Sequence, residues 1–341
     1  MIVFLLMMIP VLLAGCRKKL PDQDYMSFSQ TNALKGFFAL IIFLLHVRTC
    51  FELSDSFADR SFNTVCDLIG QLSVTLFFFY SGYGIIESVK NKPGYINSFF
   101  RKRLLKILVH FDITVVLFII AGVLTGKTYE PSRYLFALMG YRAIGNSHWF
   151  VFDILCLYFF SFVAIRISGE NRLKAANLTL LMTLVFFVVF YIKKQDSNSC
   201  WYDTVFCFPF GMYFSLYRDR IRLNTKTKIL SLLLLIAVFG VSFHLAETVN
   251  RGVFFNLASI AFVLIWCVIT SVVTFDNAVL RFLGTHSFAI YLLQRLPMIV
   301  FTYFGLNANR YVFTVICLAA TILISVGYDF CMKKLDRKLF R

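Results

Sequence analysis

Charged residues are scarce in this chain: only 15% of its 341 residues are Asp, Glu, Lys or Arg, while 59% are hydrophobic. That composition excludes an ordinary soluble domain, and apolar runs of about 20 residues, long enough to cross a bilayer, recur along the chain. The runs are continuously apolar and do not alternate with polar residues, which excludes a transmembrane β-barrel. The sequence therefore predicts an all-α, polytopic bundle of transmembrane helices.

Several common catalytic and metal-binding patterns are also missing. The chain has no Walker sequence, no G-x-S-x-G elbow, no HExxH and no H-x4-D motif of the glycerolipid acyltransferases. Its nine cysteines show neither a C-x-x-C pair nor metal-ligand spacing, so no metal site is predicted. Cys50, Cys66 and Cys200 fall on or near the predicted outer face, which leaves a disulfide open there.

About ten spans with short connections are predicted, without the internal repeat found in many transporters. Their approximate ranges are 33–49, 68–86, 104–124, 149–167, 175–192, 201–217, 229–245, 253–274, 287–304 and 311–332. The sixth is interrupted by Pro209 and Gly211. If the first span begins inside, most of the 34 Lys and Arg residues lie on the cytoplasmic side of the membrane. They include the clusters at 101–106, 218–228 and 333–341. Both ends of this core are therefore predicted to be cytoplasmic, and the net charge of +16 reflects anchoring to anionic lipid, not nucleic-acid binding.

Residues 1–25 form a segment of their own, ahead of a membrane domain predicted at 26–341. The segment begins with 14 apolar residues, short for a span, and these end in a Leu-Ala-Gly-Cys16 sequence that resembles a bacterial lipoprotein cleavage box. Lipidation of Cys16 is one interpretation. No basic region precedes the apolar run, and three basic residues follow the cysteine and would resist export. The alternatives are an uncleaved anchor and a true start at Met26.

The first predicted span contains two ionisable residues, Lys35 and His46. Eleven residues make three helical turns plus about 20°, so the two side chains share a face and lie roughly 16 Å apart along the axis. Lys35 lies where the helix leaves the cytoplasm, and His46 lies deep in the hydrocarbon. Because an ionisable group at that depth is costly, a functional role is its default interpretation.

Further polar features gather toward the predicted cytoplasmic half. Ser81 and Gly82 lie near the inner end of the second span, and the third begins with Arg103 and Lys106, which share an α-helical face. Clustered cations suit a polyanion such as the phosphates of a nucleotide-type cofactor. The alternatives are plain anchoring by positive charge and, for the Ser-Gly pair, close packing of helices.

Taken together, these features resemble the acyltransferase 3 family, whose integral-membrane members commonly O-acetylate cell-surface polysaccharides, lipopolysaccharide, peptidoglycan or secreted small molecules. The similarity extends from about residue 30 to the C-terminus. Its motifs are basic-x10-His at 35–46, Ser-Gly-Tyr at 81–83, F-x-x-K-R-x-x-K-I at 99–107, His-Trp-Phe at 148–150, F-P-x-G-M at 208–212 and a stretch at 282–292. Ten spans is what the family implies.

The chain departs from the family's pattern at three positions. Lys35 stands where arginine is usual, Gln294 where histidine is frequent, and His110 where proline is common. Lysine keeps the charge of arginine but loses its bidentate fork, and glutamine cannot titrate. No acid–base role is therefore moved onto Gln294, and His110 is interpreted as a packed, hydrogen-bonded histidine.

The resemblance implies that acyl-CoA arrives from the cytoplasm as a co-substrate, and no permanently bound cofactor is expected. Its phosphates would be held by Lys35, Arg103 and Lys106, with Ser81 and Gly82 in the same region. His46 would act as general base toward an acceptor hydroxyl, since a neutral imidazole can take a proton at physiological pH. Transfer through an acyl-histidine stays open.

Asp112 and Asp153 are the two candidates for orienting His46, because a triad needs a carboxylate behind the imidazole. The alternative is that each aspartate satisfies a neighbouring helix or faces an aqueous cavity.

The predicted protein is thus a multi-pass acyltransferase of a bacterial cell membrane that moves an acyl group, acetyl above all, to a hydroxyl of an envelope glycan or glycolipid. One rival is a glycolipid or polysaccharide transporter or flippase with His46 on the substrate or proton path. A second rival is a non-catalytic relative that acts as a membrane sensor or partner subunit.

Overall fold

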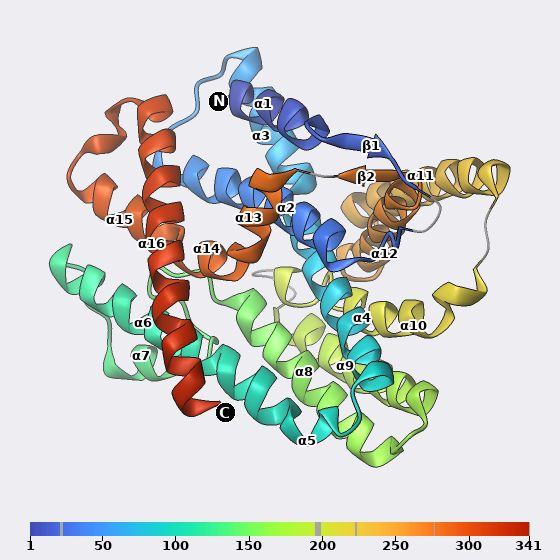
Figure 1. Ribbon diagram of the computed structural model, residues 1–341. Helices are drawn as coiled ribbons and strands as arrows, with labels where there is room; N and C mark the ends of the chain where they lie inside the picture. The colour runs from blue at the N-terminus through green and yellow to red at the C-terminus, as the bar shows by residue number, and fades with distance from the viewer. Residues whose placement is uncertain (21–22, 195–198, 222–223, 276, 341) are drawn as a thin grey trace. The chain divides into compact units, whose positions relative to one another are not determined.

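The computed structural model describes residues 1–20, 23–194, 199–221, 224–275 and 277–340. It is almost entirely helical (Figure 1), and the predicted all-α, polytopic fold is confirmed. Arg222 and Arg341, which belong to two of the predicted basic clusters, lie outside the described residues.

Within the described ranges, eight helical segments are long and apolar enough to cross a membrane. They are Phe28–Cys50, Gln71–Asn91, Tyr95–Leu124, Trp149–Ser168, Arg172–Lys193, Thr225–Thr248, Arg251–Thr270 and Arg310–Leu339. The other two predicted spans are shorter helices. The sixth holds only α10 (Cys207–Tyr217), and the ninth is divided at Gln294 into α14 (Ser287–Leu293) and α15 (Arg295–Tyr303). The count of ten spans stays a prediction.

The chain divides into two compact units, which are described separately. Unit 1 comprises Met1–Ser73, Lys106–Phe152 and Val273–Arg341. Beside α14 and α15, its elements are α1 (Ile2–Leu13), β1 (Cys16–Lys18), α2 (Phe28–Val47), α3 (Phe57–Ile69), α6 (Lys106–Leu124), α7 (Pro131–Leu138), β2 (Val273–Phe275), α13 (Ala278–Thr285) and α16 (Arg310–Leu339). Short 3-10 turns follow α2 at Arg48–Cys50 and precede α16 at Leu306–Ala308.

In unit 1, α2 and α13 touch backbone to backbone through two glycines. A Cβ on Gly36 would lie 2.0 Å from the carbonyl oxygen of Leu280, and one on Gly284 would lie 1.8 Å from that of Asn32. Both distances are far below any real contact, so neither position accommodates a side chain. The amide of Asn32 adds a hydrogen bond of 3.1 Å to Thr285 Oγ1. The residue beside Lys35 is therefore a fixed contact point of α2.

The start of α2 is held by a small antiparallel ribbon of β1 and β2, in which Cys16 pairs with Phe275. The Gln30 side chain donates to the Val273 carbonyl at 3.3 Å and accepts from the Phe275 N–H at 3.0 Å. Ser27 caps the helix by accepting from the Gln30 N–H. The apolar N-terminal segment forms α1, whose 12 residues are fewer than a span needs.

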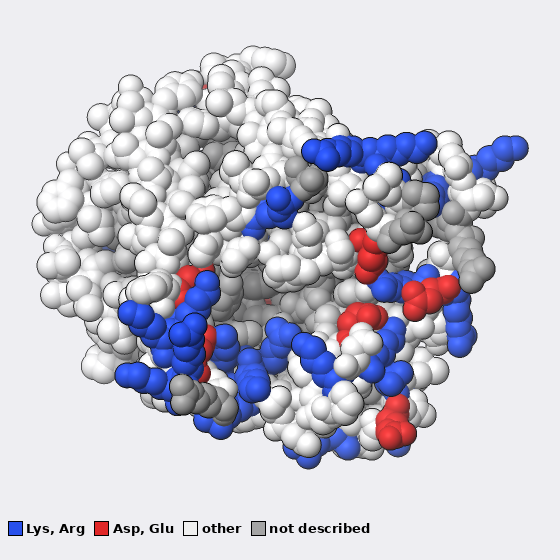
Figure 2. All heavy atoms as spheres, in the orientation of Figure 1, with Lys and Arg blue, Asp and Glu red and all other residues white. Residues whose placement is uncertain are grey.

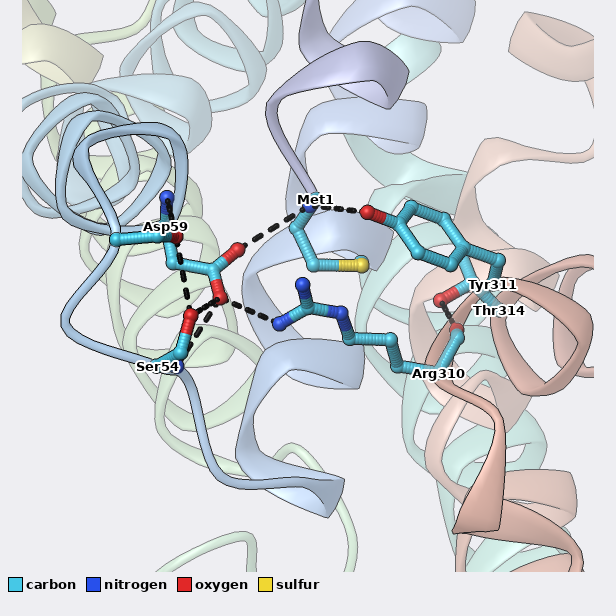
Figure 3. A network of polar contacts seen from close by, with 7 residues as sticks. Met1, Ser54, Asp59, Arg310, Tyr311 and Thr314 are labelled. Atoms are coloured by element: carbon cyan, nitrogen blue, oxygen red, sulfur yellow. Dashed lines mark hydrogen bonds and ion pairs between the residues drawn. The ribbon is translucent and has the colours of Figure 1, made fainter.

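A buried polar network joins α3 to the start of α16 (Figure 3). Asp59, 1% exposed, accepts from the Ser54 hydroxyl at 2.7 Å and from the Ser54 N–H at 3.0 Å. The Arg310 guanidinium and the Met1 amino group pair with the same carboxylate. Burial alone would raise the pKa of Asp59, but the hydrogen bonds from Ser54 and Arg310 outweigh it and hold that pKa well below its usual range.

Unit 2 comprises Val74–Leu105 and Asp153–Val272. Beside α10, its elements are α4 (Thr75–Asn91), α5 (Tyr95–Phe99), α8 (Trp149–Ser168, whose first turn belongs to unit 1), α9 (Arg172–Lys194), α11 (Thr225–Thr248) and α12 (Arg251–Thr270), with 3-10 turns at Ser199–Trp201 and Arg218–Arg220. A further 3-10 turn, Gln71–Val74, begins in unit 1 and ends at the first residue of unit 2. Glycines again bring two helices together, α4 and α10. A Cβ on Gly82 would lie 1.9 Å from the Phe208 carbonyl oxygen, and one on Gly211 would lie 2.1 Å from that of Phe79.

Candidate functional site

His46 lies in the last turn of α2 and is half-buried. The 3-10 turn after it is firmly held. Thr49 Oγ1 donates to the His46 carbonyl at 2.8 Å, and the Arg48 guanidinium binds Asp67 at 2.6 Å and Asn63 Oδ1 at 2.7 Å. These contacts fix the end of α2, so the imidazole projects from a fixed piece of backbone.

Ser147 is the hydrogen-bonding neighbour of the His46 ring. Its hydroxyl lies 3.4 Å from His46 Nε2, at the long end of the hydrogen-bond range. The loop that carries Ser147 is buried and shaped by Gly145, whose φ of +103° disfavours any residue with a side chain. A Cβ there would also lie 2.8 Å from Ile299 Cδ1, and the next residue, Asn146, accepts from the Ile144 N–H at 3.0 Å. Ser147 is thus presented to His46 by a loop with little freedom.

Two cations act electrostatically on His46, Arg295 and Arg48. Arg48 is paired with Asp67, but the side chain of Arg295 has neither a hydrogen bond nor an ion pair with any described residue. Arg295 is half-buried and begins α15, directly after the break at Gln294.

A cavity of about 230 Å³ is lined by Thr49 and Cys50, which follow His46 by three and four residues. Its wall is partly apolar, from Met298 and Ile299, and partly polar. The polar part comes from Thr49, Cys50, Thr125, Lys127, Arg295, Thr302 and Tyr303. The residue that acts on His46, Arg295, therefore also faces a space that can take a small polar molecule.

The two predicted carboxylates stand apart from this arrangement. Asp112, in α6, is half-buried, and its Oδ1 has no hydrogen-bond partner among the described residues. Within the described part of the chain, Asp112 forms no hydrogen bond or ion pair with His46. Asp153, in unit 2, is 0% exposed, and neither of its oxygens is hydrogen-bonded in the described part of the chain. A role for either in orienting His46 stays a prediction.

On the predicted donor side, unit 1 holds Lys35 and Lys106. Lys35 is half-buried beside Gly36. Lys106 forms an ion pair with Asp336 at 2.6 Å, and the same carboxylate lies 2.9 Å from His110 Nε2. His110 is 7% exposed, so its interpretation as a packed, hydrogen-bonded histidine is confirmed. Figure 2 shows Lys and Arg side chains gathered over the C-terminal end of α16.

Unit 2 holds the remaining predicted donor residues. Arg103 is exposed, and its Nε donates to the Tyr95 hydroxyl at 3.0 Å. It belongs to a π-helical turn at Phe100–Leu105, where the α-helical rule that residues three apart share a face does not apply. Ser81 is half-buried in α4, and the neighbouring Gly82 serves the contact with α10. Donor binding by any of these residues is untested.

Sequence reasoning missed Ser147 and Arg295, although each carries a signal. A functional role is the default interpretation of any ionisable residue inside an apolar span, arginine as well as histidine. Arg295 lies within the predicted ninth span. Ser147 lies between Gly145 and the His-Trp-Phe motif, in a polar stretch that precedes a span. Neither signal says which distant segment the residue meets, because that depends on how α15 and the loop pack against α2.

The comparisons with known proteins bear on this geometry. Neither the search of curated proteins nor the search of solved structures gave a significant match. The family model of the acyltransferase domain matches residues 29–329, nearly the whole chain, and includes α2, the Ser147 loop and α15. Such a match supports a membrane acyltransferase. The chain therefore belongs to the acyltransferase 3 family.

Proposed function

We propose that this protein transfers an acetyl group from acetyl-CoA to a hydroxyl of a cell-surface glycan or glycolipid, with His46 as the general base. The observation that carries the proposal is the placement of His46. It lies on the helix that also bears Lys35, it is held beside Ser147, and a partly polar cavity begins one turn further along. A base, a cation for the donor and a space for an acceptor are thus arranged along one element.

The donor's phosphates are assigned to two basic residues of unit 1, Lys35 and Lys106. Lys106 is shared with Asp336, so part of its charge is already neutralised. The rise from Lys35 to His46, roughly 16 Å, is comparable to the length of an extended pantetheine arm. The thioester then reaches the level of the imidazole while the nucleotide stays at the level of Lys35.

The transfer itself needs one base and one leaving group. His46 takes the proton of the acceptor hydroxyl as its oxygen attacks the thioester carbonyl carbon, and the new C–O bond forms. The carbonyl π electrons move to oxygen and return as the C–S bond breaks. CoA leaves as a thiolate and receives the proton from the imidazolium, so His46 ends the cycle neutral. Ser147 holds the ring in position through its contact with Nε2.

Purified protein with radiolabelled acetyl-CoA tests the proposal. Free CoA and labelled glycan are measured with and without crude envelope glycan, for the wild type and for His46→Ala. We expect His46→Ala to lower glycan-dependent CoA release by at least about 100-fold, the usual contribution of a positioned base. His244→Ala is the matched control, because His244 is an exposed histidine in unit 2, and it should keep wild-type activity.

Full activity of a well-inserted His46→Ala protein would exclude His46 as the base. If folded wild type releases no CoA even with glycan present, the donor assignment is wrong, and movement of a glycolipid without covalent change becomes the function to test.

A further inference from the structure

The cavity that Thr49 and Cys50 line carries a net positive charge. Its lining includes two cations, Lys127 and Arg295, and no Asp or Glu. Lys127 follows the end of α6 and is exposed, whereas Arg295 is half-buried against the apolar side chains of Met298 and Ile299. Two positive charges at one small cavity attract an anion from solution.

The side chains of both cations are available to a ligand. Among the described residues, neither Lys127 nor Arg295 has a side-chain hydrogen bond or an ion pair. This contrasts with other basic residues of unit 1: Arg48 is paired with Asp67, and Arg310 is paired with Asp59. A half-buried guanidinium without a partner is costly, and a carboxylate or phosphate bound in bidentate geometry removes that cost.

The remaining lining suits a sugar. Thr302 and Tyr303 add hydroxyls that donate and accept, and the apolar side chains can cover one face of a ring. The volume, about 230 Å³, is below the roughly 300–1,000 Å³ of pockets that enclose drug-sized ligands. The cavity therefore takes one saccharide unit and not a long stretch of chain.

The cavity is also coupled to the base. Arg295 acts electrostatically on His46, and Thr49 both lines the cavity and donates to the His46 carbonyl at 2.8 Å. The cavity wall at Thr49 and Cys50 follows His46 by only three and four residues along the chain.

We propose that this cavity is the acceptor subsite and that it selects saccharides with an anionic group, a carboxylate or a phosphate, on the unit that is acylated. The inference rests on the proposed function and adds the class of acceptor. Lys127 and Arg295 bind the anionic group, and the hydroxyl that is acylated points toward His46.

Cys50, which lines the same cavity, serves as a reporter that does not depend on turnover. Alkylation by anionic iodoacetate and by neutral iodoacetamide is followed at Cys50 by peptide mass spectrometry of the whole protein. We expect the rate ratio of iodoacetate to iodoacetamide to fall at least about threefold in Lys127→Gln and further in Lys127→Glu, as a unit charge that lines the same cavity as the thiol is removed and then reversed. High salt should reduce the difference.

The matched control is Arg142→Gln, because Arg142 is an exposed cation of unit 1 that does not line the cavity. It should leave the ratio at Cys50 unchanged, and the ratio at the exposed Cys331 should be the same in every variant. A ratio at Cys50 that is the same in Lys127→Gln, Lys127→Glu and wild type would overturn the proposal, whether or not the preparation transfers acetyl groups.

Acceptor selection is tested with three forms of one envelope glycan: untreated, carboxyl-reduced and dephosphorylated. We expect wild type to lose at least about tenfold in kcat/KM on the form that lacks the required anion, which tells a carboxylate from a phosphate.

Lys127→Gln should raise KM for untreated glycan about five- to tenfold with kcat retained. Equal transfer to all three forms would overturn the proposal and leave the acetyltransferase function standing. Absence of CoA release with every form would instead remove the proposed function, while alkylation of Cys50 still reports on the cavity.

Discussion

Ser147 and His46 come from segments about 100 residues apart, and their contact is the most specific polar interaction at the proposed base. A serine hydroxyl next to an imidazole nitrogen can donate to it or accept from it, so the contact favours one ring orientation without supplying a charge. The motif around His46 predicts a base but not this neighbour. Gly145 lets the loop that carries Ser147 turn at positive φ and pack closely against Ile299 of α15.

Removing the Ser147 hydroxyl should weaken the orientation of the ring and leave the base in place. We expect Ser147→Ala to lower kcat roughly 2- to 10-fold, the effect of one lost hydrogen bond, with KM for acetyl-CoA unchanged. Steady-state kinetics with varied acetyl-CoA gives both constants. A loss as large as that of His46→Ala would mean that Ser147 does more than position the ring, and an unchanged kcat would mean that the contact is idle.

Asp59 offers a second prediction for a single residue, on stability. Its folded-state pKa lies below the unfolded value near 3.9, so the carboxylate stabilises the fold fully above that pH and loses its contribution as the pH falls further. We expect Asp59→Asn to lower the Tm in detergent at pH 7, with the difference from wild type shrinking below about pH 4.

Asp67→Asn is the control for that series, because Asp67 lies on the same helix but is 59% exposed, and its partner Arg48 keeps the bond to Asn63 when that carboxylate is lost. If Asp59→Asn and Asp67→Asn shift the Tm equally at pH 7, the buried network with Arg310 adds no stability.

Among elements, the packing of α2 on α13 and of α4 on α10 explains several motif residues at once. Gly36 follows the basic residue of the first motif, and Gly82, Gly211 and Gly284 belong to three others. Each meets a backbone carbonyl where a Cβ would clash, so these glycines serve packing, which is an alternative that the sequence left open for Gly82. Motif membership alone does not separate a packing residue from a reacting one.

We therefore expect Gly284→Ala to separate α2 from α13, with a lower Tm and a lower yield of inserted protein. Gly327→Ala is a matched control: this glycine also lies in a helix, but a Cβ there meets nothing within 4 Å. Because alanine favours the helix by about 1 kcal/mol over glycine, Gly327→Ala should leave the Tm unchanged or raise it. Equal Tm values for the two variants would contradict the close contact.

The sequence predicted the long, continuous helices well and the short or interrupted ones poorly. Long apolar runs such as α9 and α11 fix their helices by composition alone. The segment with Pro209 forms the short α10, and the segment with Gln294 is divided into α14 and α15, so an apolar run there did not mean a continuous helix. The break at Gln294 is what places Arg295 at the start of a new helix beside the cavity, and no periodicity in the sequence marks it.

For the whole molecule, the predicted orientation can be tested on one helix. The 30 residues of α16 extend about 45 Å, more than the roughly 30 Å of bilayer hydrocarbon, so the helix is long enough for its ends to emerge on opposite sides. Positive charge predicts that the end with Lys338 is cytoplasmic. In intact cells, a membrane-impermeant maleimide should label Ala308→Cys and should label Lys338→Cys only after permeabilisation. The reverse pattern would invert the topology and place the donor residues outside.

The backbone contact of α2 with α13 has one more consequence. Lys35 and His46 are carried by one helix that is pinned next to Lys35 by Gly36 and beyond His46 by the bonds of Arg48 and Thr49. A helix held at both ends keeps its length, so under the proposed function α2 sets a separation of roughly 16 Å between the donor's phosphates and the base. Thioesters with a shortened arm should bind at Lys35 and still present their carbonyl at the wrong height, which makes donor length itself a criterion of selection.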